Sequence, residues 1–370
     1  MFWRIASISC VLAALSVCPA WAQQTPAAPA ARSGSSVLQG APQLTTPPGG
    51  YAGTLQRVSV HGPSLVGNLE GDSPDRMVSI YLPPSYAKQP TRRYPVLYVL
   101  HGFTDSDTRW FGLRGPHFVN LPSAVDQADA HGARELIVVM PDAFTHYQGS
   151  MYSNSVTTGN WEAFITRDLV RYIDTHYRTL AVRASRGLAG HSMGGYGTLR
   201  LAMKYPGVFT AIYALSPCCL GANLTPDPKV MQKAAHVADA DLGGTDFGTL
   251  AMLASAAAWS PDPKKPPHYF DLPIEDGKAN PTVIAAWAAN APLAMLFQYV
   301  PNLRTYTGIA VDAGDRDAFI APTVTAIDQL LSGFGIEHVA EIYPGNHVDH
   351  IQQRLIEKVL PFFSRHLKFD

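Results

Sequence analysis

The stretch Gly187-Leu188-Ala189-Gly190-His191-Ser192-Met193-Gly194-Gly195 holds a serine with a glycine two residues away on either side. A short apolar segment precedes this serine, and the helical pattern of residues 196–204 follows it. A serine in the motif G-x-S-x-G, between a strand and a helix, stands on a sharp, strained turn with its Oγ exposed. Gly190 and Gly194 leave room for neighbouring chain to approach closely. Ser192 is therefore the candidate nucleophile, at the end of a predicted strand.

Short apolar or alternating segments on both sides of this turn predict eight strands. They are residues 54–60, 76–82, 95–100, 135–140, 187–190, 209–215, 306–312 and 338–343. The first two alternate and lie close together in sequence, as in an antiparallel edge, whereas the later ones are continuous apolar runs separated by helical patterns. The clearest helix is residues 161–177, where large apolar side chains recur at spacings of three and four. The pattern predicts a mostly parallel α/β sheet covered by helices.

The composition is that of a globular protein with little net charge. The chain has 370 residues, of which 46% are hydrophobic and 15% charged, so it is too apolar for a disordered protein. The formal net charge is -1, and no run of five or six like charges occurs. This balance gives no electrostatic footprint for nucleic acid or an anionic membrane surface. We expect a small, largely neutral substrate and no nucleic-acid partner.

The N-terminus has the pattern of an export signal. Arg4 precedes the apolar run of residues 5–19, and the small-x-small site Ala20-Trp21-Ala22 follows. The run is shorter than the roughly 20 apolar residues of a membrane span. We predict a signal peptide over residues 1–22, a periplasmic or secreted location, and no membrane span after cleavage. Residues 23–50, rich in Ala, Pro, Ser, Gln and Gly, are predicted to be a disordered tether before one domain at 51–370.

Cysteine usage changes once the signal is removed, because Cys10 and Cys18 leave with it and the adjacent pair Cys218-Cys219 remains. Two interpretations stay open: two small buried apolar residues after a strand, or a strained disulfide between neighbours in an oxidising compartment. Neither interpretation suggests zinc.

A second predicted strand ends in His101-Gly102-Phe103. A strand exit of this kind supplies a backbone amide to an oxyanion hole, and we assign that amide to Phe103 by its position after Gly102. The Met193 amide, at the start of the helix after Ser192, is the expected second donor, since the helix dipole favours a developing negative charge there. His101 has two interpretations: a catalytic base, or a ring that holds the oxyanion loop through hydrogen bonds. It is also a candidate substrate-binding residue.

Three acids and two histidines are candidates to complete the site. Asp312, Asp315 and Asp317 follow the strand predicted at 306–312, and their spacing does not choose among them. His347 follows the last strand and Gly345, whereas His350 falls in a predicted helix over 348–359, so we prefer His347. The order serine, acid, histidine is the one found in α/β-hydrolases. The motif H-x-D-H, formed by His347, Asp349 and His350, is compatible with a metal site. Such a site would need a further histidine two residues before His347, and that position is Gly345, so no metal site is predicted.

Over residues 50–369 the chain resembles the esterase D-like group of the α/β-hydrolase superfamily. This group includes S-formylglutathione hydrolases, feruloyl and other short-acyl esterases, and mycolyltransferases. The segments that carry the resemblance are Tyr81-Leu82-Pro83-Pro84-Ser85-Tyr86, Tyr94-Pro95-Val96-Leu97-Tyr98-Val99-Leu100-His101-Gly102, Met140-Pro141-Asp142, the Gly190–Gly195 turn and Lys204-Tyr205-Pro206. The resemblance implies an α/β-hydrolase fold and singles out Asp317, three residues after Gly314, as the acid of a Ser192-His347-Asp317 triad. The mechanism that these assigned residues support requires no cofactor.

Residues 221–300 depart from that pattern and form an insertion before the acid strand. They contain Trp259 and Trp287 in Ala-rich helical stretches, which makes a lid over the pocket one interpretation and ordinary packing on the sheet edge the other. Under the first, Trp259 and Trp287 are candidate substrate-binding residues.

The predicted function is that of an exported serine carboxylesterase. It would hydrolyse short-acyl or aromatic-acyl esters, or thioesters, through an acyl-enzyme. One alternative is an acyltransferase that passes the acyl group to a sugar or an alcohol. A more distant one is a non-catalytic binding protein on the same fold, whose sign would be a missing triad member.

Overall fold

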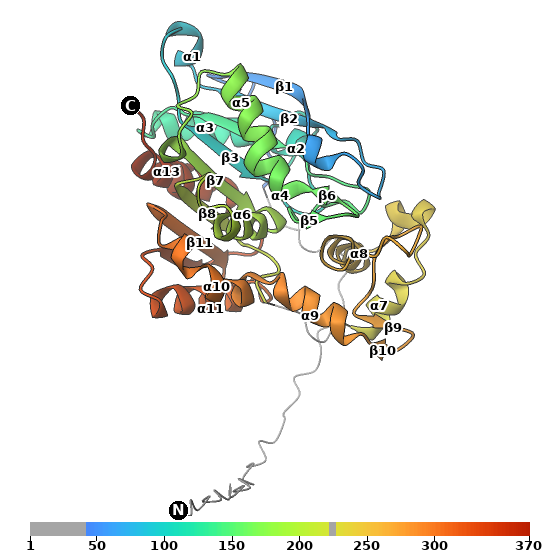
Figure 1. The fold of residues 1–370 in the computed structure, drawn as a ribbon. Helices are drawn as coiled ribbons and strands as arrows, with labels where there is room; N and C mark the ends of the chain where they lie inside the picture. The colour runs from blue at the N-terminus through green and yellow to red at the C-terminus, as the bar shows by residue number, and fades with distance from the viewer. Residues whose placement is uncertain (1–41, 222–226) are drawn as a thin grey trace, which may run out of the picture. The chain divides into compact units, whose positions relative to one another are not determined.

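Eight strands form one sheet in the spatial order β1-β2-β4-β3-β7-β8-β11-β12 (Figure 1). The structure is a computed structural model that describes residues 42–221 and 227–370. β1 pairs with β2 and β2 with β4 in antiparallel fashion, and the other neighbours are parallel. The strands are β1 (Thr54–His61), β2 (Asp75–Leu82), β3 (Val96–Leu100), β4 (Ile137–Pro141), β7 (Arg186–His191), β8 (Ala211–Leu215), β11 (Gly308–Gly314) and β12 (Val339–Tyr343). All eight predicted strands are confirmed, with ends within two residues of the prediction.

Helices cover both faces of the sheet, as continuous apolar strands require. They are α1 (Ser85–Lys88), α2 (Asp107–Trp110), α3 (Leu121–Ala130), α4 (Trp161–Ala163), α5 (Val170–His176), α6 (Met193–Lys204), α7 (Pro228–Ala234), α8 (Phe247–Trp259), α9 (Pro281–Ala289), α10 (Pro292–Leu303), α11 (Ala321–Gly333), α12 (Ile351–Arg354) and α13 (Leu360–His366). A π-helical segment, Phe164–Leu169, joins α4 to α5, so the helix predicted over 161–177 is confirmed. Two short hairpins are β5 (Asn154–Ser155) with β6 (Gly159–Asn160), and β9 (Ile274–Glu275) with β10 (Lys278–Ala279).

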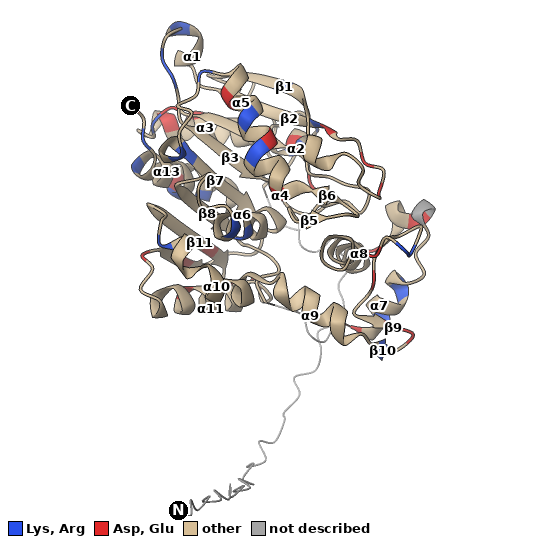
Figure 2. Ribbon diagram, in the orientation of Figure 1, with Lys and Arg blue, Asp and Glu red and all other residues tan. Residues whose placement is uncertain are grey.

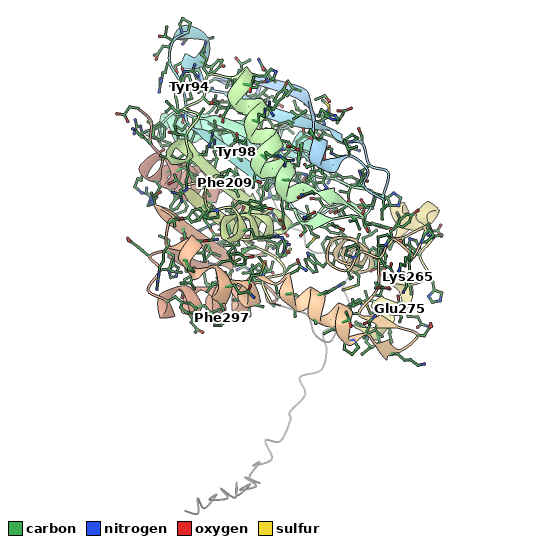
Figure 3. All side chains as sticks on the ribbon, viewed as in Figure 1. Tyr94, Tyr98, Phe209, Lys265, Glu275 and Phe297 are labelled. Carbon is green, nitrogen blue, oxygen red and sulfur yellow. The ribbon has the colours of Figure 1, made fainter. Side chains whose placement is uncertain are left out.

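The two faces of the sheet have separate apolar cores. Successive side chains of β3 point to opposite faces, so Tyr98 belongs to one core and Leu97 to the other. The Tyr98 core takes side chains from α5, α6, α10 and α11, and there Tyr98 meets Phe209 edge to face at 5.7 Å (Figure 3). The Leu97 core takes side chains from α3, α12 and α13. Burial on both faces explains why the parallel strands read as unbroken apolar runs.

The insertion between β8 and β11 divides into two parts. α10 packs against the sheet, with Met295 and Leu296 in the Tyr98 core. α7, α8 and α9 instead share a third apolar core, which includes Trp287 and Phe270. An ion pair between Lys265 and Glu275 closes the loop beside that core (Figure 3). The predicted insertion over 221–300 therefore ends in a helix of the main body.

Part of the predicted tether lies against the domain. Leu44 forms an isolated antiparallel bridge with His117, with N–H to O distances of 2.7 and 3.0 Å. The Thr46 hydroxyl donates to the Gly112 carbonyl at 3.1 Å. These hydrogen bonds attach Leu44 and Thr46 to the domain, in contrast to the disorder predicted for residues 23–50. The prediction used composition alone, and composition does not show which backbone groups a segment can pair with. The predicted signal peptide, residues 1–22, and residues 23–41 of the predicted tether lie outside the described residues.

Charged side chains are scattered over the elements, and those of α5 include both signs (Figure 2). Among the described residues, no single helix is long and apolar enough to cross a membrane, although α9 and α10, bent by 43°, reach that length and hydropathy together.

Candidate active site

Ser192 stands on the turn between β7 and α6 in a strained conformation, with φ 56° and ψ -115°. Residues other than glycine rarely adopt a positive φ. This backbone strain is typical of the strand-to-helix turn that carries the nucleophile in the motif G-x-S-x-G. The glycines beside it are required sterically. A Cβ on Gly194 would lie 2.0 Å from the Leu100 carbonyl oxygen, and one on Gly190 would lie 2.3 Å from the Gly194 oxygen. The predicted close approach of chain at both glycines is confirmed.

The carboxyl ends of the parallel strands meet at one edge of the sheet, where open α/β sheets place their sites. Leu100 is in register with Gly190, and His191 with Leu215. Gly314 is in register with Tyr343 at the next pair. Loops far apart in sequence therefore surround Ser192.

The three candidate acids have three different partners. Asp312 is fully buried and accepts from Arg354 Nε at 2.6 Å. Asp315 Oδ1 accepts from the Gly345 amide at 2.9 Å, which ties the acid loop to the histidine loop. Asp317 Oδ2 lies 2.5 Å from His347 Nδ1. Because a carboxylate accepts, Nδ1 donates to Asp317, which leaves Nε2 as the ring nitrogen that faces away from the acid.

A cavity of about 120 Å³ opens beside Ser192 and His347. Its lining combines apolar and polar side chains. The apolar ones include Phe103, Phe118, Phe247 and Val348, and the polar ones include Thr104, Asp105, Arg109 and His117. Gly102 lies close to the nucleophile, since a Cβ there would be 3.4 Å from Ser192 Cβ. The candidate nucleophile and the candidate histidine therefore line one small cavity.

The Esterase family model matches residues 73–350, most of the chain. The chain belongs to the Esterase family. Esterase Rv1288 of Mycobacterium tuberculosis (strain H37Rv) is 31% identical over 281 residues, which cover 73% of this chain and 52% of that protein. The S-formylglutathione hydrolase of Bos taurus is 28% identical over 160 residues, which cover 38% of this chain and 51% of that enzyme. This member of the Esterase family spans about half the length of the curated relatives it matches.

Solved structures show the same fold. A ferulic acid esterase aligns with a TM-score of 0.60 at 20% identity, over 85% of this chain and 98% of that chain. Staphylococcus aureus fluorophosphonate-binding serine hydrolase F aligns with a TM-score of 0.57 at 19% identity, over 84% and 98%. The resemblance to esterases drawn from sequence motifs and the predicted α/β-hydrolase fold are both confirmed.

His101 holds the loop before the cavity. Its ring is fully buried, and Nδ1 donates to the Gly102 carbonyl at 2.8 Å. Nε2 accepts from the Ala143 amide at 2.8 Å. Both nitrogens are therefore occupied by backbone, and the ring is not part of the cavity wall. This placement agrees with the structural interpretation and differs from the expectation of substrate contact.

His191, which sequence reasoning did not single out, orients the histidine loop. Its Nε2 lies 2.9 Å from the His347 carbonyl oxygen, so Nε2 carries the proton and donates. Burial, and after it electrostatic repulsion from His347, lower the pKa of His191 to about 3. The His191 ring is therefore neutral at ordinary pH. The sequence places His191 directly before Ser192, at the end of a predicted strand, and this position next to the candidate nucleophile could have identified it.

The insertion contributes a different aromatic residue from those predicted. Phe247, the first residue of α8, lines the cavity and meets Phe103 edge to face at 5.4 Å. Trp259 instead donates from Nε1 to Ser153 Oγ at 3.3 Å, and the buried Trp287 donates to Ser260 Oγ at 2.9 Å. Both tryptophans pack away from the cavity, which corrects the expectation that they bind substrate. The two tryptophans instead belong to the apolar core that the helices of the insertion share.

Cys218 and Cys219 follow β8 as free, partly buried thiols. Cys219 Sγ lies 2.8 Å from Cys218 Sγ, and the Cys218 amide donates to the Ser192 carbonyl at 3.1 Å. The hydrogen bond from Cys219 and burial raise the pKa of the Cys218 thiol, which keeps it protonated at neutral pH. Among the described residues, no group of three or more His, Cys, Asp or Glu is arranged to hold a metal ion.

Proposed function

We propose that this chain is an exported serine hydrolase of carboxylic esters or thioesters, with Ser192, His347 and Asp317 as its triad. The observation that carries the proposal is the 2.5 Å contact between His347 Nδ1 and Asp317, in a site where His347 and the strained Ser192 line one cavity. A carboxylate on Nδ1 fixes the tautomer whose Nε2 can take a proton from serine.

The reaction follows from these roles. His347 Nε2 takes the Ser192 proton as Oγ attacks the acyl carbon, and the Phe103 and Met193 amides bind the oxygen that becomes negative. Met193 opens α6, so its N–H has no acceptor within the helix. The intermediate collapses to an acyl-enzyme and a leaving alcohol or thiol, which receives the proton from His347. Water then attacks the acyl-enzyme, with His347 as base, and releases the acid.

Relatives support the choice of substrate classes to test. Proteins similar to this chain are named S-formylglutathione hydrolase and ferulic acid esterase, which are a thioesterase and an aromatic-acyl esterase by name. Export is proposed from the sequence of residues 1–22.

Replacement of the nucleophile tests the proposal. Ser192→Ala should lower kcat for 4-nitrophenyl butyrate, a feruloyl ester or an acyl thioester by roughly 10⁶-fold, as in other triads. A fluorophosphonate should label the wild-type protein at Ser192 and leave Ser192→Ala unlabelled. Retained turnover in a folded Ser192→Ala protein would remove Ser192 from the mechanism.

A further inference from the structure

A second, larger groove lies next to the catalytic cavity and shares part of its wall. It has a volume of about 730 Å³, and Thr104, Asp105 and Arg109 line both spaces. We name it the arginine groove, because Arg57, Arg109 and Arg114 are part of its wall. The rest of its wall is Ser106, Thr108, Leu113, Asp142, Phe144 and Gln148. A substrate bound at Ser192 therefore lies beside a groove that is polar and rich in guanidinium groups.

The acids of the groove already have partners. Asp105 accepts from Trp110 Nε1 at 2.6 Å and lies 3.4 Å from His117 Nε2. Asp142 lies 4.0 Å from Arg76, which does not line the groove. These carboxylates are held by cations or donors of the protein itself.

One of the three arginines is also compensated. Arg57 Nε lies 2.8 Å from Asp107 Oδ2, and its NH2 group lies 3.2 Å from Asp107 Oδ1, a bidentate pair. The fully buried Asp107 thus takes up the charge of Arg57. Arg57 lines the groove, and because Asp107 and, at 3.9 Å, Asp142 share its charge, it offers little net charge to a ligand.

Arg109 and Arg114 differ from Arg57. Both are exposed, and neither guanidinium has a carboxylate within 4.0 Å among the residues that the structure describes. Exposed arginines are ordinarily solvated and bind nothing. Here Arg109 lies at the junction of the two spaces and lines the same cavity as Ser192, so its charge acts on whatever that cavity holds.

The segment that carries these arginines is held in place. Ser106 Oγ accepts from the Arg109 amide at 3.4 Å at the start of α2, and Trp110 is fully buried. Beyond Arg114, His117 pairs with Leu44 through backbone hydrogen bonds. A fixed backbone lowers the entropy cost of ordering the two side chains on a ligand.

We infer that the substrate carries an anionic group, a carboxylate, sulfate or phosphate, which Arg109 and Arg114 bind while the ester lies at Ser192. Guanidinium groups pair with such oxyanions through two parallel hydrogen bonds. The apolar side chains of Phe103, Phe118 and Phe247 in the cavity lining would contact the apolar part of the substrate next to the ester. This inference rests on the proposed function and refines its substrate class. It departs from the largely neutral substrate expected from the net charge of -1, because total charge averages over a locally cationic groove.

Matched ester pairs test the inference, and two arms separate an acyl-side anion from an alcohol-side anion. The acyl arm compares the 4-nitrophenyl monoester of glutaric acid with 4-nitrophenyl valerate. The alcohol arm compares the butyrate ester of 4-hydroxybenzoate with that of its methyl ester. The wild-type protein should have the higher kcat/KM for the anionic member of at least one pair.

The variant Arg109→Gln/Arg114→Gln should lower the anionic-to-neutral ratio of kcat/KM about tenfold, a loss expected for hydrogen bonds to charged groups. Raising the salt concentration from 0.05 to 0.5 M should lower the wild-type ratio and leave the ratio of the double variant nearly constant. Arg365→Gln, on α13 and in neither wall, is the control and should keep the wild-type ratio.

Three outcomes would overturn the inference: a wild-type ratio of one or less in both arms, an equal ratio in the double variant, or an equal fall in Arg365→Gln. These outcomes are distinct from failure of the proposed function, in which hydrolysis of the neutral esters would survive Ser192→Ala.

Discussion

At the scale of residues, three carboxylates close together in the chain, those of Asp312, Asp315 and Asp317, have different roles. Asp312 is fully buried beside Arg354 and Tyr213, where burial raises its pKa despite the attraction of Arg354. Asp315 holds the Gly345 amide, and Asp317 meets His347. Two of the three therefore support structure, while Asp317 is placed to hold the ring of the proposed base.

The prediction at this scale concerns those acids. Asp317→Asn should lower kcat by roughly 10⁴-fold, because an amide no longer enforces the tautomer in which His347 Nε2 accepts. Asp315→Asn should lower kcat far less, since an amide oxygen can still accept from Gly345. Asp312→Asn should mainly lower stability, because it leaves the buried Arg354 with a weakened partner. The measurements are kcat and the melting temperature of each variant.

A contrary result would be informative about register. Should Asp315→Asn or Asp312→Asn be the folded but inactive protein, the assignment of the acid to Asp317 would be wrong.

The sequence identified some of these residues better than others. Ser192 followed from a local motif whose glycines are sterically required. The choice of the acid required the family resemblance. Asp312 is distinguished by its partner Arg354, and Asp317 by its partner His347, and each partner lies at least 30 residues further along the chain. Phe247 and Arg109 were not foreseen, since the cavity that they share is formed by chain folding and has no local pattern.

At the scale of elements, a buried carboxylate joins two helices of one face. Glu162 on α4 is fully buried and contacts Arg200 Nε at 2.8 Å and Lys204 Nζ at 2.6 Å, both on α6. The Tyr205 hydroxyl donates to it at 2.7 Å. Burial alone would raise the pKa of Glu162, but the two cations outweigh it and the pKa is lowered. The cluster ties the helix that follows Ser192 to its neighbour.

Glu162→Gln should therefore lower the free energy of unfolding by about 3–5 kcal/mol at pH 7, since it leaves Arg200 buried without its counter-charge. Because the folded-state pKa is depressed, the wild-type advantage is present above the unfolded pKa of about 4.3 and is lost as pH falls through the lower folded pKa. Urea unfolding followed from pH 7 down to pH 2 measures both effects.

The exposed Glu337 provides the control, and Glu337→Gln should change the free energy by less than about 0.5 kcal/mol. An equal stability difference between wild type and Glu162→Gln down to pH 2 would contradict the pKa direction.

At the scale of the whole molecule, the sheet could be predicted because its strands are short, apolar and regularly spaced. The insertion could not, because Ala-rich helices with few charges fit a lid, a core helix or an edge helix equally. The structure divides it between the main body, which holds α10, and a separate apolar core of α7, α8 and α9. Among the described residues, Tyr147 is the buried member of that separate core that comes from outside the insertion.

This division predicts unequal stability within the described domain. Opening α7 and the β9–β10 hairpin exposes the small third core and leaves the two sheet cores intact, so it should cost less free energy than opening β7 or β8. Hydrogen exchange followed by mass spectrometry should show exchange in residues 228–234 and 274–279 well before exchange in residues 186–191 and 211–215. Equal protection of both sets would mean that the insertion unfolds only with the sheet. The result bears on catalysis because Phe247 lies in the same insertion and forms part of the cavity wall, so local opening there would widen the cavity beside Ser192.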